Sequence, residues 1–128
     1  MDRVIGFIGA GNMGGALLGG LAREGLQNRV LVFDVSGQAL ANAVSLGAEA
    51  ASSAAEVAMK ADIIVLAVKP QFYPDVLPQI QGNLHRTAMV ISLAPGYDIA
   101  ALKKALGQEQ RIVRAMPNTP ALLGEGMT

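Results

Sequence analysis

Five short, largely apolar runs recur along this chain, and longer segments of helical period separate them. The runs are Val4–Ile8, Val30–Phe33, Ile63–Val68, Met89–Leu93 and Ile112–Ala115. Continuous apolarity, in place of alternation, predicts strands buried on both faces, as in a parallel sheet between two layers of helices. The sequence therefore predicts an α/β fold with an open, doubly wound and mostly parallel sheet that carries helices on both faces.

The segments between these runs carry signals for helix starts and ends. The expected helices are Asn12–Glu24, Gly37–Leu46, a helix that opens at Ser53-Ala54-Ala55-Glu56 and runs through Lys60, Tyr73–Ile80 and Ile99–Leu106. The third helix opens with capping-box spacing, and Asp98 can cap the last. Gly47 and Gly107 follow two of the helices as C-terminal caps. Pro78 should end or kink the helix that contains it.

Composition excludes several classes of protein. The chain has 128 residues, of which 52% are hydrophobic and 16% charged, so we expect one domain with a compact core. Lys plus Arg equals Asp plus Glu at ten each, without a basic stripe for nucleic acid or a polybasic cluster for a membrane. Cysteine is absent and His85 is the one histidine, so we expect no metal site. No apolar run approaches the ~20 residues of a membrane span, and we expect no secretory signal, which favours a soluble, cytoplasmic protein.

Gly9-Ala10-Gly11-Asn12-Met13-Gly14 matches the G-x-G-x-x-G pattern of dinucleotide-binding turns. A predicted strand enters it, a predicted helix leaves it, and Asp34 ends the next strand 20 residues after Gly14. Gly9 permits the tight turn, Gly11 lets the backbone approach a pyrophosphate, and Gly14 lets the helix pack near the strand. In this context we favour a Rossmann-type cofactor site over the alternative of an ordinary glycine-rich turn.

Asp34 bears on the choice of cofactor. A carboxylate at the end of the second strand accepts hydrogen bonds from the adenosine ribose hydroxyls and repels a 2′-phosphate. Residues 35–43 contain no Arg or Lys that would hold such a phosphate. The expected cofactor is NADH or NADPH, and Asp34 favours NADH. Alternatively, Asp34 caps the following turn or helix, although Ser36 could do that instead.

Three segments together resemble the pyrroline-5-carboxylate reductases. They are Phe7–Gly14 with the fingerprint, Ala67-Val68-Lys69-Pro70 at the end of the third predicted strand, and Arg114–Ala121, which reads RAMPNTPA and is the most selective. The resemblance runs over essentially the whole chain. It implies NAD(P)H-dependent reduction of the cyclic imine pyrroline-5-carboxylate to proline, the last step of proline synthesis. In such chemistry the cofactor carries the hydride and the protein orients the reactants.

The fingerprint and the resemblance together assign the site residues. The expected cofactor-binding positions are Gly9, Ala10, Gly11, Asn12, Met13, Gly14, Asp34, Ala67, Val68, Lys69, Pro70, Ala94, Gly96, Asn118 and Thr119. By resemblance, Asn118 and Thr119 lie near the nicotinamide or the substrate. No residue is assigned as catalytic. Lys69 is the most tempting acid, but a Lys-Pro pair at a strand end more often positions a loop than donates a proton.

The chain departs from the family's pattern in sequence and in length. Many members have Ala-Ala-Gly where this chain has Ala94-Pro95-Gly96, and many have an asparagine near Ala54 that contacts the adenosine side of the cofactor. By resemblance, a second, helical domain supplies most of the substrate pocket and of the dimer interface. We expect residues 1–128 to be the dinucleotide-binding domain alone. The parent would be a homo-oligomer with a small imino-acid substrate, whereas this chain would be mainly monomeric with little or no turnover.

Two other interpretations remain open. One is the cofactor domain of another oxidoreductase, such as a coenzyme F420-dependent NADP reductase or a β-hydroxyacid dehydrogenase, which the segment Met116–Pro120 disfavours. The other is a non-enzymatic nucleotide-binding module that acts as a sensor or a partner subunit.

Overall fold

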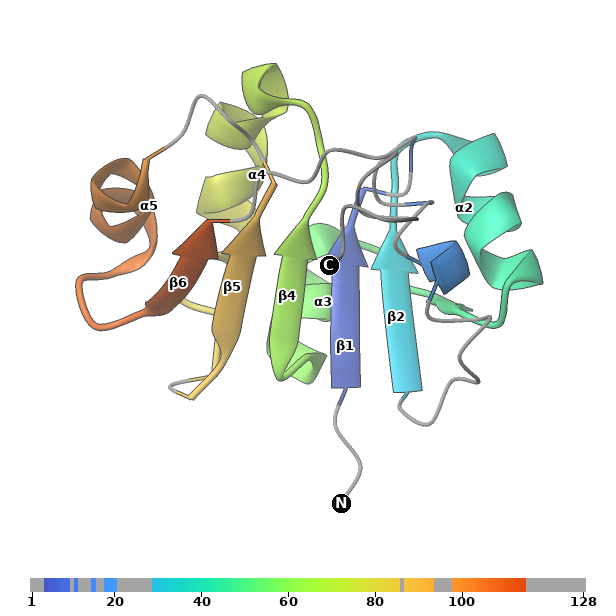
Figure 1. Ribbon diagram of the computed structural model, residues 1–128, viewed down its shortest axis with the longest axis horizontal. Coiled ribbons are helices and arrows are strands. Elements are labelled where there is room, and N and C mark those ends of the chain that lie inside the picture. Colours follow the sequence, from blue (N-terminus) through green and yellow to red (C-terminus); the bar gives the residue numbers. More distant parts are fainter. Residues whose placement is uncertain are drawn as a thin grey trace, which may run out of the picture.

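The computed structural model describes residues 4–9, 11, 15, 18–20, 29–85, 87–93 and 98–114. Within these ranges, six strands form one sheet in the order β3-β2-β1-β4-β5-β6, and every neighbouring pair is parallel. The strands are β1 Val4–Ile8, β2 Arg29–Phe33, β3 Glu49–Ala50, β4 Ile63–Leu66, β5 Met89–Ser92 and β6 Arg111–Arg114 (Figure 1). The predicted open, doubly wound parallel sheet is confirmed.

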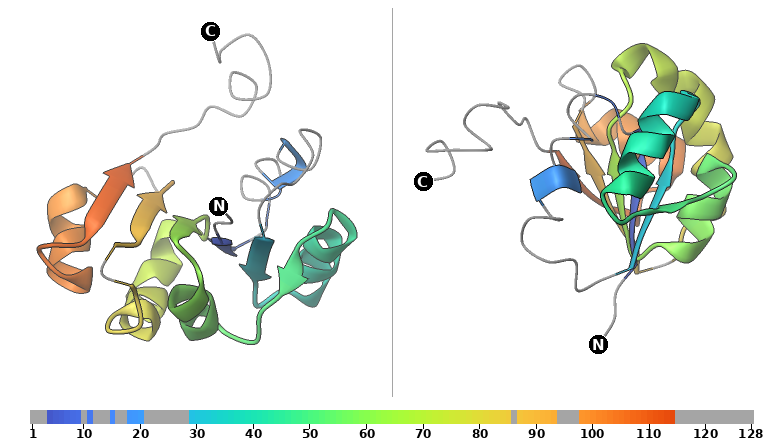
Figure 2. Two further views of the ribbon diagram at one scale, coloured as in Figure 1. Left: turned by 90° about the horizontal axis from the view of Figure 1, so that it is seen from below. Right: turned by 90° about the vertical axis from the view of Figure 1, so that its right-hand side faces the viewer.

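Helices lie on both faces of this sheet. The described helices with defined bounds are α2 Gly37–Ser45, α3 Ala54–Lys60, the short 3-10 helix η1 Pro70–Phe72, α4 Tyr73–Ile80 and α5 Ile99–Leu106. Helices α3, α4 and α5 line one face, and residues 18–20 lie on the other (Figure 2). Each face has its own buried cluster, with Val57, Leu77 and Leu102 in the first and Leu18 and Ala43 in the second.

The register brings three strand ends side by side. Ile8 at the end of β1 pairs with Phe33 of β2 on one side and with Leu66 of β4 on the other. The chain reverses its direction of travel across the sheet at β1, where β2 lies to one side and β4 to the other. Loops that leave adjacent carboxyl ends diverge at such a reversal and leave a crevice in which ligands of this fold class bind.

A glycine inside β1 lets α3 approach the sheet closely. A Cβ added to Gly6 would overlap the Val57 side chain and lie 2.9 Å from Ala61 Cβ. Ala58, which is fully buried, continues the same small-residue surface of α3. This close packing fixes where α3 begins relative to the end of β1.

Most predicted helix ends are confirmed. Ser53 caps α3 by accepting the Glu56 N–H, and Asp98 caps α5 by accepting the Ala101 N–H. Gly107 follows α5 with a φ of 126°. Of the predicted helix Asn12–Glu24, residues 15 and 18–20 are described and helical, and its bounds lie outside the described residues.

Two details of the elements differ from the sequence expectations. The third predicted strand ends at Leu66, two residues short of Val68, because the chain turns there into the loop before η1. Strand β3 was not predicted, since it has two exposed residues and no apolar run. Helix α4 continues past Pro78 to Ile80, so its predicted range is confirmed and Pro78 does not end it, and the alternative of a kink stays a prediction. Burial of Leu77 and Ile80 on the sheet offsets the one helical hydrogen bond that Pro78 cannot donate.

Candidate cofactor-binding site

A cavity of about 420 Å³ opens at the carboxyl ends of β1, β2 and β4. Its lining comes from the turn after β1, the end of β2, the start of α3, the loop after β4, and one face of η1 and α4. The described lining residues are Ile8, Gly9, Gly11, Phe33, Asp34, Val35, Ala54, Ala67, Val68, Lys69, Phe72, Asp75, Val76 and Gln79. Of the predicted cofactor-binding residues, the cavity brings together Gly9, Gly11, Asp34, Ala67, Val68 and Lys69.

Gly9 is required by the fold itself. Its φ of 98° lies in the region that side chains disfavour, and an added Cβ would lie 2.8 Å from the Ala67 carbonyl carbon. Its N–H donates to the Phe33 carbonyl at 2.8 Å, and the Ala67 N–H donates to the Ile8 carbonyl at 2.8 Å. The turn after β1 is therefore held against both neighbouring strand ends.

Gly11 lines the cavity for a different reason. Its φ is outside the left-handed region, and a Cβ built there would meet no atom of the described residues within 4 Å. The fold thus has no need of a glycine at this position. A missing side chain here enlarges the cavity and exposes backbone to whatever fills it, which fits the close approach of a pyrophosphate. The different surroundings of Gly9 and Gly11 agree with the different roles that the sequence pattern gives them.

Asp34 reaches the cavity and also shapes the loop after β2. Its Oδ1 accepts the Ser36 N–H at 2.8 Å, and Ser36 Oγ accepts the Ala39 N–H at 3.2 Å as the cap of α2. The alternative role considered for Asp34, the capping of a turn, is therefore present. Asp34 therefore caps this turn and lines the cavity at the same time.

The loop after β4 forms the wall opposite Asp34. Ala67, Val68 and Lys69 all line the cavity, and the Lys69 carbonyl accepts the Phe72 N–H at 2.9 Å as η1 begins at Pro70. Lys69 is the one cation among the described lining residues, and it is exposed. Its place in the loop agrees with a positioning or phosphate-contacting role.

The wall provided by α4 was missed in the sequence analysis. Phe72, Asp75, Val76 and Gln79 line the cavity at relative positions i, i+3, i+4 and i+7, which share one face of a helix. This spacing directly after a strand end was visible in the sequence and could have identified them. Val35 was also missed, although its side chain is 90% exposed at the cavity rim.

A buried polar contact anchors α4 to the sheet. Tyr73 at its start and Ser92 at the end of β5 are both fully buried, and their hydroxyl oxygens lie 2.8 Å apart. Buried polar groups that are satisfied in this way favour one packing arrangement over its neighbours. The cavity face of α4 is therefore carried on a fixed support.

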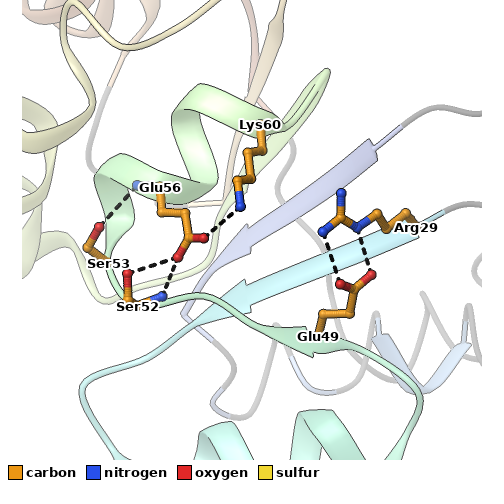
Figure 3. Close-up of polar contacts among 6 residues, drawn as sticks. All are labelled: Arg29, Glu49, Ser52, Ser53, Glu56 and Lys60. Carbon is orange, nitrogen blue, oxygen red and sulfur yellow. Dashed lines mark hydrogen bonds and ion pairs between the residues drawn. The ribbon is translucent and has the colours of Figure 1, made fainter.

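The start of α3 is held by a network of polar contacts (Figure 3). Ser53 Oγ accepts the Glu56 N–H at 3.0 Å, and Glu56 Oε1 accepts the Ser52 N–H at 2.6 Å and the Ser52 hydroxyl at 2.9 Å. Lys60 Nζ lies 2.8 Å from Glu56 Oε2. The hydrogen bond from Lys60, followed by those from Ser52, lowers the pKa of Glu56 to about 2. This network fixes Ala54, which is buried at the cavity wall.

A second ion pair joins β2 to β3 on the exposed edge (Figure 3). Arg29 donates to both carboxylate oxygens of Glu49, at 2.7 Å and 3.0 Å. The hydrogen bond from Arg29 lowers the pKa of the Glu49 carboxyl. The pair is solvated and neither residue lines the cavity, so its contribution is to secure a short edge strand.

Several predicted positions lie outside the described residues. They are Ala10, Asn12, Met13, Gly14, Ala94, Gly96, Asn118 and Thr119. Pro70 begins η1. Among the described residues, no three acidic or histidine side chains gather as a possible metal site. His85 is exposed and its Nε2 contacts the Met59 carbonyl. No described helix is long and apolar enough to cross a membrane.

Together these features fit an elongated ligand with a charged centre and an apolar end. Gly11 leaves backbone open to a phosphate, Asp34 offers a carboxylate beside it, and Val35 and Phe72 offer apolar surface. Residues 4–96 match the model of the family described as NADP oxidoreductase, coenzyme F420-dependent, which covers more than half of the chain. The chain belongs to this family.

Comparisons with individual proteins find similar pyrroline-5-carboxylate reductases. The chain is 47% identical over 131 aligned positions to the pyrroline-5-carboxylate reductase of Escherichia coli K12, with 100% of this chain and 49% of the relative covered. The chain thus spans about half the length of the curated relatives it matches. The sequence resemblance is confirmed over the full chain.

Solved structures of pyrroline-5-carboxylate reductases also superpose on this chain. A pyrroline-5-carboxylate reductase from Coxiella burnetii superposes with a TM-score of 0.83 at 38% identity, covering 94% of this chain and 46% of that one. The pyrroline carboxylate reductase of Plasmodium falciparum, solved with NADP bound, gives 0.80 at 33% identity, covering 95% and 45%.

Proposed function

We propose that this chain binds a nicotinamide dinucleotide in its cavity and is the cofactor domain of an enzyme that reduces pyrroline-5-carboxylate to proline. The observation that carries the proposal is the full-length similarity to pyrroline-5-carboxylate reductases, at 47% identity to the E. coli protein. The cavity supports it, because its lining contains Gly11 and Asp34 where a pyrophosphate and a ribose would be held.

The residues of this chain would bind the cofactor and orient it for the reaction. A bound reduced nicotinamide supplies the hydride for the imine carbon, so no nucleophile is required of the protein. The turn from Gly9 to Gly14 would hold the pyrophosphate, with Ala67 to Pro70, Ala94 and Gly96 bordering the dinucleotide. Asn118 and Thr119 would lie at its nicotinamide end. We assign no proton donor within this chain.

We further propose that the site prefers NADH to NADPH. Asp34 lines the cavity with one carboxylate oxygen committed to the Ser36 N–H, which holds the negative charge in place. Residues 35–43 carry no cation, and Lys69 is the one positive side chain among the described lining residues. A 2′-phosphate beside Asp34 would be repelled unless Lys69 reaches it.

The complete active site would need a second domain. A cavity walled by strand ends and α4 presents one side of a cleft, and hydride transfer requires both reactants to be held in near-attack geometry with water excluded. We propose that residues outside this chain supply the remaining substrate contacts and the contacts of a homo-oligomer.

Two assays of the complete gene product test this function. One measures reduction of pyrroline-5-carboxylate with NADH, and the other measures oxidation of a 3-hydroxy acid with NAD⁺. We expect turnover of the imine and none of the hydroxy acid. Turnover of the hydroxy acid alone would favour a β-hydroxyacid dehydrogenase, and binding of cofactor without turnover of either would favour a nucleotide-binding module.

A further inference from the structure

The loop between β4 and α4 is closed at its base by the side chain of Tyr73. Leu66 is the last residue of β4, and Tyr73 is the first residue of α4. The Tyr73 hydroxyl donates to the Leu66 carbonyl at 3.4 Å, so the side chain returns to the point where the chain left the sheet. Residues 67–72 between them form what we call the cavity loop, because 67–69 and Phe72 line the cavity.

Ser92 holds the Tyr73 hydroxyl from the neighbouring strand. Ser92 is the last residue of β5, and its Oγ lies 2.8 Å from the Tyr73 hydroxyl oxygen. Both side chains are fully buried. When Ser92 donates to Tyr73 and Tyr73 donates to Leu66, each hydroxyl proton has an acceptor, which keeps the cost of burying two hydroxyls low. The Tyr73 hydroxyl thus joins the ends of β4 and β5 at the base of the cavity loop.

The peptide group between Leu66 and Ala67 links this contact to the turn after β1. Its carbonyl accepts from Tyr73, and its N–H, which belongs to Ala67, donates to the Ile8 carbonyl at 2.8 Å. Ile8 leads directly into Gly9, which lines the cavity and packs against the Ala67 backbone. A peptide group is planar, so a displacement of its carbonyl also moves its N–H. A change at the Tyr73 hydroxyl would therefore reach the turn after β1.

We propose that Tyr73 is a positioning residue of the cofactor site. Its hydroxyl, held by Ser92, fixes the cavity loop and the turn after β1 in the arrangement that accepts a dinucleotide. Tyr73 is not among the described lining residues, so it would act through the loop and not by contact with the cofactor. A loop that is ordered before binding spares the ligand the free energy of ordering it. The inference rests on the proposed cofactor binding and adds to it a residue of the supporting core.

Calorimetric titration of Tyr73→Phe with NADH, together with urea unfolding of the same variant, tests the inference. Phenylalanine fills the space of the ring, so the variant should fold. Its urea midpoint should be lower than that of the wild type, because the Ser92 hydroxyl loses a buried partner. Its dissociation constant for NADH should rise by about 3- to 10-fold, the effect of one lost hydrogen bond.

Gln110→Leu is the matched control for a loss of stability away from the cavity. Gln110 Nε2 donates to the Ala88 carbonyl at 2.7 Å in a partly buried contact beside the amino end of β5, and neither residue lines the cavity. This variant should also have a lower urea midpoint. Its dissociation constant for NADH should equal that of the wild type, since lower stability does not change the affinity of a chain that stays folded. A purely structural role for Tyr73 would produce this same pattern.

The double variant Tyr73→Phe/Ser92→Ala separates positioning from stability. Removal of both hydroxyls leaves neither without its partner, so the urea midpoint should recover towards that of the wild type. NADH binding should stay weak, because the contact with the Leu66 carbonyl is still missing. Circular dichroism reports folding, and the double variant carries the same prediction for NADH binding if Tyr73→Phe does not fold.

The outcomes distinguish this inference from the proposed function. Wild-type affinity for NADH in folded Tyr73→Phe, or recovery of both the midpoint and the affinity in the double variant, overturns the positioning role and leaves cofactor binding intact. Failure of the wild type to bind NADH overturns both.

Discussion

Gly9 and Gly11 stand two residues apart in one motif and have different roles. Gly9 has a positive φ and an added Cβ would overlap the Ala67 backbone, so the fold needs it, whereas a Cβ on Gly11 would meet no atom of the described residues within 4 Å. The motif predicted a turn role for Gly9 and a pyrophosphate role for Gly11, and the structure shows which atoms make Gly9 necessary. Substitution of Gly9 should therefore lower mainly stability, and substitution of Gly11 should lower mainly cofactor binding.

Gly11→Val should bind NADH more than about tenfold more weakly, a loss above about 1.4 kcal/mol, because the branched side chain occupies the space of the pyrophosphate. Its free energy of unfolding should stay within about 0.5 kcal/mol of wild type, as for surface substitutions. Gly9→Val should instead lose stability by more than about 1 kcal/mol. Urea unfolding and calorimetry measure the two quantities. Tight NADH binding by folded Gly11→Val would refute the placement of the pyrophosphate.

Asp34→Ser should narrow the preference for NADH over NADPH. Two charges about 4 Å apart in water interact by about 1 kcal/mol, so the ratio of the two dissociation constants should fall by about fivefold. Serine can still accept the Ser36 N–H, which keeps the loop after β2 in place. Asp98→Ser is the control, since it keeps an N-cap on α5 and lies outside the cavity. If the wild type favours NADPH, the proposed preference for NADH is wrong, and Lys69 is the lining residue to test next for contact with the 2′-phosphate.

The elements show which sequence signals are reliable here. Caps at Ser53 and Asp98 were predicted because a side-chain oxygen three residues before a helical N–H is a local feature. Strand β3 was missed because its pairing with β2 depends on a neighbour 18 residues earlier and on the exposed Arg29–Glu49 pair. Pro78 lies inside α4 within the range predicted for this helix, and burial of Leu77 and Ile80 offsets its missing hydrogen bond. The local capping signals could be predicted from the sequence, whereas the pairing of β3 with β2 could not.

The network at the start of α3 predicts a specific acid response. The folded-state pKa of Glu56 is about 2, below the ordinary 4.5, so its ionised form stabilises the fold. That contribution is complete above about pH 4.5 and is lost as the pH falls towards 2. Glu56→Gln should lower the urea midpoint at pH 7, and its midpoint should fall less steeply than wild type over this range.

Glu109→Gln provides the control for this experiment, because Glu109 is exposed in the turn after α5 and away from the α3 network. It should follow the wild-type pH profile. Parallel profiles for wild type and Glu56→Gln would show that the contacts of Glu56 with Ser52 and Lys60 add nothing to stability.

At the scale of the whole molecule, the arrangement of the sheet explains why this chain by itself can form the cavity proposed to hold the cofactor. The crevice forms where β2 and β4 diverge from β1, entirely within the chain, and its floor was predictable from the order of strands and helices. The α4 wall was not predicted, because the rule that places ligands at strand ends does not say which helix face borders the crevice. The chain matches about half the length of these relatives, and our proposal assigns the opposite wall of the cleft to residues outside it.

The central claim is that this chain is the cofactor domain of an enzyme that reduces pyrroline-5-carboxylate. The most direct test compares the turnover of pyrroline-5-carboxylate by the complete gene product and by the 128-residue chain, at equal concentration and with saturating NADH. The complete protein should reduce the imine. The isolated chain should bind NADH but turn over at least ~100-fold more slowly, because a single wall cannot hold the imine within about 1 Å of its reactive position. Comparable rates, or a complete protein that binds NADH and leaves the imine unreduced, would contradict the account.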